Sequence, residues 1–196
     1  MILMAAMMAG GCAPPPVTPP ASPKPLSSDG PAPPAAPASS PLIGADVARV
    51  QWDVAENRAQ CAPLALRSDG GAAGKARPAQ FSGGWAVAFD LPGVRSAYGF
   101  AGPGTIAIDA EPDAAQRARL TRQWPYMRDL PTLPHPAFAG YGVVGAEPYP
   151  ADNADGKGLH SLAYLRIGGQ HCTYNVWSRI SRAHLETLLD NLRVQD

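Results

Sequence analysis

The chain has 196 residues, a length that accommodates a single domain of ordinary size. It carries 16 basic and 16 acidic side chains, so no net charge is available to hold it on a nucleic acid or on an acidic membrane surface, and nucleic-acid binding is not expected. Its 23 prolines and 20 glycines exceed ordinary usage. They are concentrated in particular segments, so they do not indicate disorder of the whole chain.

The first residues form a short apolar run, MILMAAMMAGG, that ends in small residues directly before Cys12. It is shorter than the roughly 18 apolar residues that a membrane-spanning helix needs. Residues 1–12 resemble the signal peptide of bacterial lipoproteins, in which a lipobox of small residues precedes a cysteine. The resemblance implies that Cys12 is diacylated and becomes the mature N-terminus. Two acyl chains suffice for stable anchoring, so a membrane-anchored protein of the bacterial cell envelope is expected.

Two features of this segment leave an alternative open. Leu is usual in the lipobox where Ala9 stands here, and no Lys or Arg precedes the apolar run. We expect the true start codon to lie upstream, so that a basic segment comes first. The alternative is an ordinary secretory signal followed by an incidental Cys12.

Residues 13–41 read APPPVTPPASPKPLSSDGPAPPAAPASSP, with twelve prolines and few residues able to join a core. Such a segment cannot bury enough apolar surface to offset the entropy of ordering it, so a disordered tether is expected. Proline favours an extended backbone of about 3.1 Å per residue, which gives a maximum reach of roughly 90 Å. The alternative is a P-x-x-P ligand for an aromatic-lined groove of a partner.

Residues 42–196 have the composition of one folded domain. Valines at helical spacing after Asp46 predict a helix that runs toward Cys61. Glycine, serine and alanine make 68–78 a loop by composition. Large and small side chains alternate in 85–90, WAVAFD, which predicts a half-buried strand.

Two strands are expected next, over 97–101 and 105–109, around a Gly-Pro-Gly turn. A helix is predicted from Pro112 to Trp124, because proline and acidic residues are favoured in a first turn. Three prolines then make 130–136 a loop.

The last third contains the clearest tertiary pattern. A Gly-rich strand over 139–146 and a loop over 147–158 are followed by two β-rich segments, 159–167 and 172–177. The Gly-Gly pair that separates these two segments predicts a β-hairpin.

A C-terminal helix is predicted from its cap and its apolar face. Ser181 is a typical N-cap residue, and Ile180 before it can pack on the first turn. Glu186, Asp190 and Arg193 are expected on the other faces of the helix. The apolar face, which should cover the hairpin, consists of Leu185, Leu188, Leu189 and Leu192.

The predicted order of elements is α-βββ-α-βββ-α. Consecutive strands joined by short turns favour antiparallel pairing. The expected class is therefore α+β, with a mainly antiparallel sheet of about five or six strands and the C-terminal helix packed on it.

Cys61 and Cys172 remain once Cys12 is lipidated. An even pair in an oxidising envelope compartment is normally a disulfide, which is the expected state. Two free buried thiols are the alternative. No C-x-x-C motif is present, so redox catalysis is not expected.

The sequence offers no motif for a metal, a cofactor or a catalytic residue, and none of the three is expected. The Gly70–Lys75 stretch has the wrong spacing for a phosphate loop, and ADNADGKGL lacks the ligands of a calcium loop. The four histidines, none of them at metal-site helix spacing, are His135, His160, His171 and His184.

Six aromatic residues on predicted strands are expected in the core, and a groove for an apolar ligand or a glycan is the alternative. They are Trp85, Phe89, Tyr98, Phe100, Tyr174 and Trp177.

Two functions are compatible with these patterns. The first is a non-catalytic envelope module that binds a protein or cell-wall partner while the tether lets it search. The second is an envelope enzyme or small-ligand binder, which would be marked by a deep pocket that gathers His135, His160 or Asp152.

Overall fold

The computed structural model describes residues 40–103 and 111–195. The expected signal peptide, the strand expected over 105–109 and all but the last two residues of the expected tether lie outside these ranges. In the ranges that are described, no helix is both long and apolar enough to cross a bilayer.

The domain is built around a seven-stranded sheet in which every neighbouring pair of strands is antiparallel, in the order β2-β3-β4-β8-β7-β6-β5. A second sheet contains two short strands, β1 and β9. The α+β class is confirmed, with more strands than the five or six expected. The strands are β1 (Leu64–Leu66), β2 (Lys75–Ala79), β3 (Trp85–Leu91), β4 (Val94–Gly102), β5 (Tyr126–Asp129), β6 (Phe138–Val143), β7 (Ser161–Arg166), β8 (Tyr174–Ser178) and β9 (Leu192–Val194).

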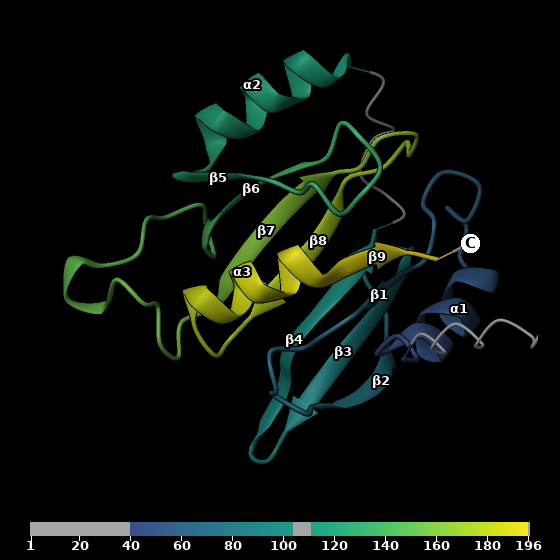
Figure 1. The fold of residues 1–196 in the computed structure, drawn as a ribbon, viewed down its shortest axis with the longest axis horizontal. Helices are drawn as coiled ribbons and strands as arrows, with labels where there is room; N and C mark the ends of the chain where they lie inside the picture. The colour runs from purple at the N-terminus through teal and green to yellow at the C-terminus, as the bar shows by residue number, and fades with distance from the viewer. Residues whose placement is uncertain (1–39, 104–110, 196) are drawn as a thin grey trace, which may run out of the picture. The chain divides into compact units, whose positions relative to one another are not determined.

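The three α-helices divide between the two faces of the large sheet (Figure 1). Helices α1 (Ala45–Asp53) and α3 (Arg182–Asn191) pack with the small sheet on the main core, and we call the face beneath them the inner face. Helix α2 (Asp113–Gln123) packs on the alternate strand residues of β5, β6 and β7, which form the outer face. A 3₁₀ turn (Ala151–Asn153) lies in the loop before β7.

The predicted hairpin and C-terminal helix are both confirmed. Strands β7 and β8 pair antiparallel, and Ser181 caps α3 by accepting a hydrogen bond from the backbone N–H of His184. The four leucines of the helix are fully buried, because they face the sheet. The helix ends at Asn191, so the last of these leucines begins β9.

Two polar residues of α3 are not plain surface positions. Glu186 accepts hydrogen bonds from the hydroxyl of Tyr141 at 2.6 Å and from Nε of Arg182 at 2.8 Å. Burial alone would raise the pKa of Glu186, but these two donors hold it below its usual value. Asp190 pairs through both carboxylate oxygens with Arg128, at 2.9 and 2.6 Å. The helix is therefore tied to strands β5 and β6 by charge as well as by its leucines.

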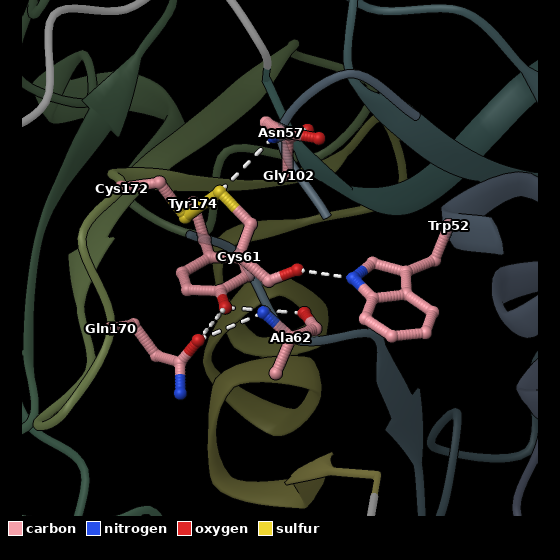
Figure 2. The surroundings of a disulfide bond; sticks show 8 residues. All are labelled: Trp52, Asn57, Cys61, Ala62, Gly102, Gln170, Cys172 and Tyr174. Carbon is pink, nitrogen blue, oxygen red and sulfur yellow. Dashed lines mark hydrogen bonds between the residues drawn. A yellow bond between two sulfur atoms is a disulfide. The ribbon is translucent and has the colours of Figure 1, made fainter. Parts of the chain in front are cut away.

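Cys61 and Cys172, the pair expected to be crosslinked, are joined by a disulfide with an S–S distance of 2.07 Å and a Cα–Cα distance of 5.7 Å. Figure 2 shows the bridge beside Asn57, whose Nδ2 donates to Sγ of Cys61, and beside Tyr174, whose hydroxyl donates to the carbonyl of Ala62. The cysteines are 111 residues apart, and closing a loop of about 100 residues is worth about 4.7 kcal/mol in the chain-entropy model. The bridge holds the segment after α1 against the connection between β7 and β8.

Candidate functional site

Beyond the part covered by α2, the outer face of the sheet carries small residues on β3 and β4. Ala86 of β3 lies opposite Ala101 of β4, and Ala88 lies opposite Gly99. Opposite residues of an antiparallel pair point to the same face, so these four residues form one shallow floor. The large side chains of β3 point to the inner face, so only small side chains of this strand lie on the outer face.

Trp177 of β8 lies on this floor. It is the cross-strand neighbour of Gly99, and a Cβ built on that glycine would collide with Cζ2 of the indole. The indole Nε1 donates a hydrogen bond to the carbonyl oxygen of Ser96 at 3.2 Å. The ring is thus held in place before any ligand arrives, which lowers the entropic cost of binding.

A hollow of about 260 Å³ opens beside this indole, and we call it the indole hollow. Its apolar walls include Phe81, Leu162 and Trp177, and its lining also contains the floor residues Ala86 and Ala88. Three of its polar residues are Gln80, His160 and Arg179.

These three polar side chains are available to a ligand. None of them makes a hydrogen bond or ion pair with another residue of 40–103 or 111–195, and the lining contains no acidic residue. Burial lowers the pKa of His160, and the positive charge of Arg179 lowers it further. Near neutral pH the hollow therefore presents a guanidinium, a neutral imidazole and an amide beside an indole, which suits an anionic or hydroxyl-rich group.

A second hollow, of about 420 Å³, lies on the same face against α2. We call it the Trp124 hollow. The rings of Trp124 and Tyr164 meet there with centroids 5.4 Å apart, and Trp124 packs over Gly140. Gln123 and Thr173 also line it, as does Arg119, which pairs with Glu111 at 3.3 Å.

Asn175 lies between the two hollows. It is the cross-strand neighbour of Tyr164 on one side and of Ala101 on the other. The residue is fully buried, and neither atom of its amide has a hydrogen-bond partner in the part of the chain that the structure describes. An unpaired buried amide is costly, so this position is a candidate site for a bound water.

The histidines do not come together as a site. His135 and His171 are exposed, His160 lies in the indole hollow, and His184 is a buried residue of α3. Over the two described ranges, no group of three or more His, Cys, Asp or Glu residues could hold a metal ion. Of the three residues named for a deep pocket, His160 lines the indole hollow, and His135 and Asp152 are exposed.

His184 contacts a serine, but the pair lacks the form of a nucleophilic site. Its Nδ1 lies 2.9 Å from Oγ of Ser178, and its Nε2 lies 3.0 Å from the backbone oxygen of Asp69. The carboxylate of Asp69 is occupied elsewhere, by the hydroxyl of Tyr98 and by backbone N–H groups of its own loop. Ser178 is fully buried, so no substrate reaches it.

Five of the six aromatic residues on predicted strands are fully buried, as the core interpretation requires. The exception is Trp177, which is partly exposed and fits the alternative of a binding groove. The alternation of side chains along β8 could have indicated this position, because Tyr174 and Val176 point to the inner face and Trp177 points to the outer face. Phe81, Leu162 and Arg179 were missed, since only the order of strands brings them to the same hollow.

Comparison of the chain with protein-family models, with curated proteins and with solved structures finds no significant match.

Proposed function

We propose that the protein is a lipid-anchored module of the bacterial cell envelope that binds carboxylate-bearing glycan of the cell wall in the indole hollow. The resemblance of residues 1–12 to a lipoprotein signal peptide supports the anchor at Cys12. The proline-rich segment 13–41 has the composition of a spacer that would let the domain search the surface around its anchor.

The observation that carries the proposal is the fixed, partly exposed indole of Trp177. An aromatic ring offers a flat apolar surface on which the C–H face of a sugar ring packs, and it loses little entropy because it is already rigid. The small residues around it leave room for a ring. A shallow hollow of this size suits one sugar unit of a polymer better than an enclosed small molecule.

The polar residues select the chemistry of that sugar. Arg179 is exposed, and a guanidinium binds a carboxylate through two parallel hydrogen bonds. Gln80 and His160 supply further donors and acceptors for hydroxyl groups. None of the lining residues within 40–103 and 111–195 is acidic, so no described side chain of the hollow would repel a carboxylate.

The test is co-sedimentation of the full chain, carrying Cys12→Ala to keep it soluble, with purified insoluble peptidoglycan sacculi. We expect Trp177→Ala and Arg179→Ala each to weaken binding by about tenfold, which corresponds to about 1.4 kcal/mol. Both substitutions lie at partly or fully exposed positions, so the fold should persist.

Val54→Ala is the matched control, because Val54 is 80% exposed, lies at the end of α1 and does not line the indole hollow. This variant should sediment like the unsubstituted protein. Absence of binding to sacculi, or equal binding of all variants, would contradict the proposal.

A further inference from the structure

We infer that the Trp124 hollow is a second sugar subsite on the outer face, so that the domain recognises at least two successive units of a glycan chain rather than a single ring. This inference rests on the proposed function and specifies its substrate as a polymer.

The register of β7 and β8 places the two hollows next to each other. Leu162 and Trp177 are cross-strand neighbours that line the indole hollow. The next pair on the same face, Tyr164 and Asn175, is two residues further along each strand, and Tyr164 lines the Trp124 hollow. Two residues of a strand cover about 7 Å. A linear ligand that enters both hollows therefore passes from the Leu162–Trp177 pair to the Tyr164–Asn175 pair.

The second hollow resembles the first in part, although its indole is more buried, since Trp124 is 8% exposed and belongs to the apolar cluster beneath α2. Each contains an indole packed over a glycine, Trp177 over Gly99 and Trp124 over Gly140. Each also has an exposed glutamine in its lining, and none of the described residues that line either hollow is acidic. Similar linings on one continuous face fit repeated units of one polymer better than two unrelated ligands.

Asn175 is the independent observation at the junction. Its buried amide has one acceptor and two donor hydrogens, and no described residue satisfies either atom. Hydroxyl and acetamido groups of a sugar chain offer both complementary functions. Asn175 is fully buried and lines neither hollow, so a sugar chain would reach it only through a water, and a water that bridges from the junction would satisfy an amide that the protein itself leaves unpaired.

The experiment measures affinity as a function of ligand length, by titration calorimetry on the full chain carrying Cys12→Ala. The probes are the disaccharide of N-acetylglucosamine and N-acetylmuramic acid and the tetrasaccharide made of two such units. We expect the tetrasaccharide to bind at least tenfold more tightly than the disaccharide. Asn175→Leu should bring the affinity for the tetrasaccharide down toward that for the disaccharide.

The thermal midpoint of Asn175→Leu distinguishes binding from structure. Replacing an unpaired buried amide with an apolar group of similar size should not lower stability, so a loss of tetrasaccharide affinity at an unchanged or higher Tm supports the subsite. Gln123 lies at an exposed position of the Trp124 hollow, and Gln123→Ala should reduce the affinity for the tetrasaccharide several-fold. This variant tests the second subsite if Asn175→Leu does not fold.

Equal affinity for the two probes, or full tetrasaccharide affinity in the folded variants, would overturn the second subsite and leave the proposed function standing. Failure of both probes and of sacculi to bind would instead overturn the proposed function.

Discussion

His184 is the residue whose protonation state the fold determines most clearly. Its Nε2 faces a backbone carbonyl of Asp69, which only accepts, so Nε2 carries the proton of the neutral ring. Nδ1 then accepts from the hydroxyl of Ser178, and Ser178 in turn accepts from the backbone N–H of Ile180. A charged ring would add a donor at Nδ1 and break this chain of hydrogen bonds.

The domain should lose stability in mild acid because of this histidine. Burial lowers the pKa of His184 below its usual 6.5, although its hydrogen bond to Asp69 and the charge of that residue act in the other direction. The unfolded chain therefore takes up the proton first as the pH falls, and the free energy of unfolding decreases below about pH 6.5. At neutral pH and above, the contribution is fully present.

Urea unfolding at pH 7.5 and pH 5 measures this effect, and His184→Gln should reduce the difference between the two free energies. His160 has a lowered pKa as well and contributes with the same sign. His160→Asn, at a partly exposed position, is therefore the matched comparison. An unchanged pH dependence in His184→Gln would refute the assignment.

Among the helices and strands, those that are stabilised by interactions between residues close in sequence could be predicted from local sequence patterns. Helix α3 and the β7-β8 hairpin were predicted correctly, because a leucine stripe, an N-cap serine and a Gly-Gly turn act over a few residues. Strand β3 was predicted from its period of two. Strand β6 was predicted too long at its C-terminal end, since it stops at Val143.

The elements that were missed depend on distant partners. Strands β1 and β9 have three residues each, and Leu64 pairs with Val194 at the far end of the chain. Strand β2 lies partly in the segment expected to be a loop, since its composition is polar and includes Pro78. It is an edge strand, the place where proline is tolerated in a sheet. Helix α1 ends at Asp53, earlier than expected, and turns fill the remainder before Cys61.

Helix α3 should contribute much of the domain's stability through its buried face. Leu188 is fully buried, and Leu188→Ala removes methyl groups and leaves a cavity, which should cost roughly 2 to 5 kcal/mol. Val54→Ala also removes methyl groups, but from a side chain that is 80% exposed, and should change stability by less than about 0.5 kcal/mol.

Urea midpoints at neutral pH compare the two variants. Similar shifts would mean that α3 does not pack as described. Glu186 and Asp190, expected from the sequence to lie on other faces of the helix, are unsuitable as neutral controls, because both accept hydrogen bonds from side chains of the sheet.

At the scale of the whole molecule, the candidate site could be predicted only in part. Trp177 was singled out with two possible roles, a core residue or part of a binding groove, and its partial exposure favours the second. The rest of the indole hollow comes from segments almost 100 residues apart, Phe81 before β3 and Arg179 after β8. Phe81 and Arg179 meet because β8 pairs with β4 in the sheet. The alternation of side chains within a strand does not predict this order of strands.

The disulfide and the large sheet give the protein a rigid body, while its proposed anchor lies at the other end of a proline-rich segment. Binding to a fixed cell-wall polymer from a lipid anchor depends on both parts, since attachment to the membrane raises the effective concentration of the domain near its ligand. The anchor is therefore a separate, testable requirement of the proposed function.

Metabolic labelling with a palmitate analogue should tag the protein in cells, and Cys12→Ala should abolish the tag. The reason is that the residues before Cys12 resemble a lipobox, and acylation at that cysteine supplies the two chains that stable membrane attachment requires. A variant with both Cys61→Ala and Cys172→Ala is the control, because it lacks the other cysteines and should keep the tag even if its domain is destabilised.

Membrane fractionation should agree with the labelling: the labelled protein should be found in the membrane fraction and Cys12→Ala in the soluble fraction. Equal labelling of Cys12→Ala and the unsubstituted protein would rule out the anchor, whereas loss of label together with loss of sacculus binding in cells would link attachment to function.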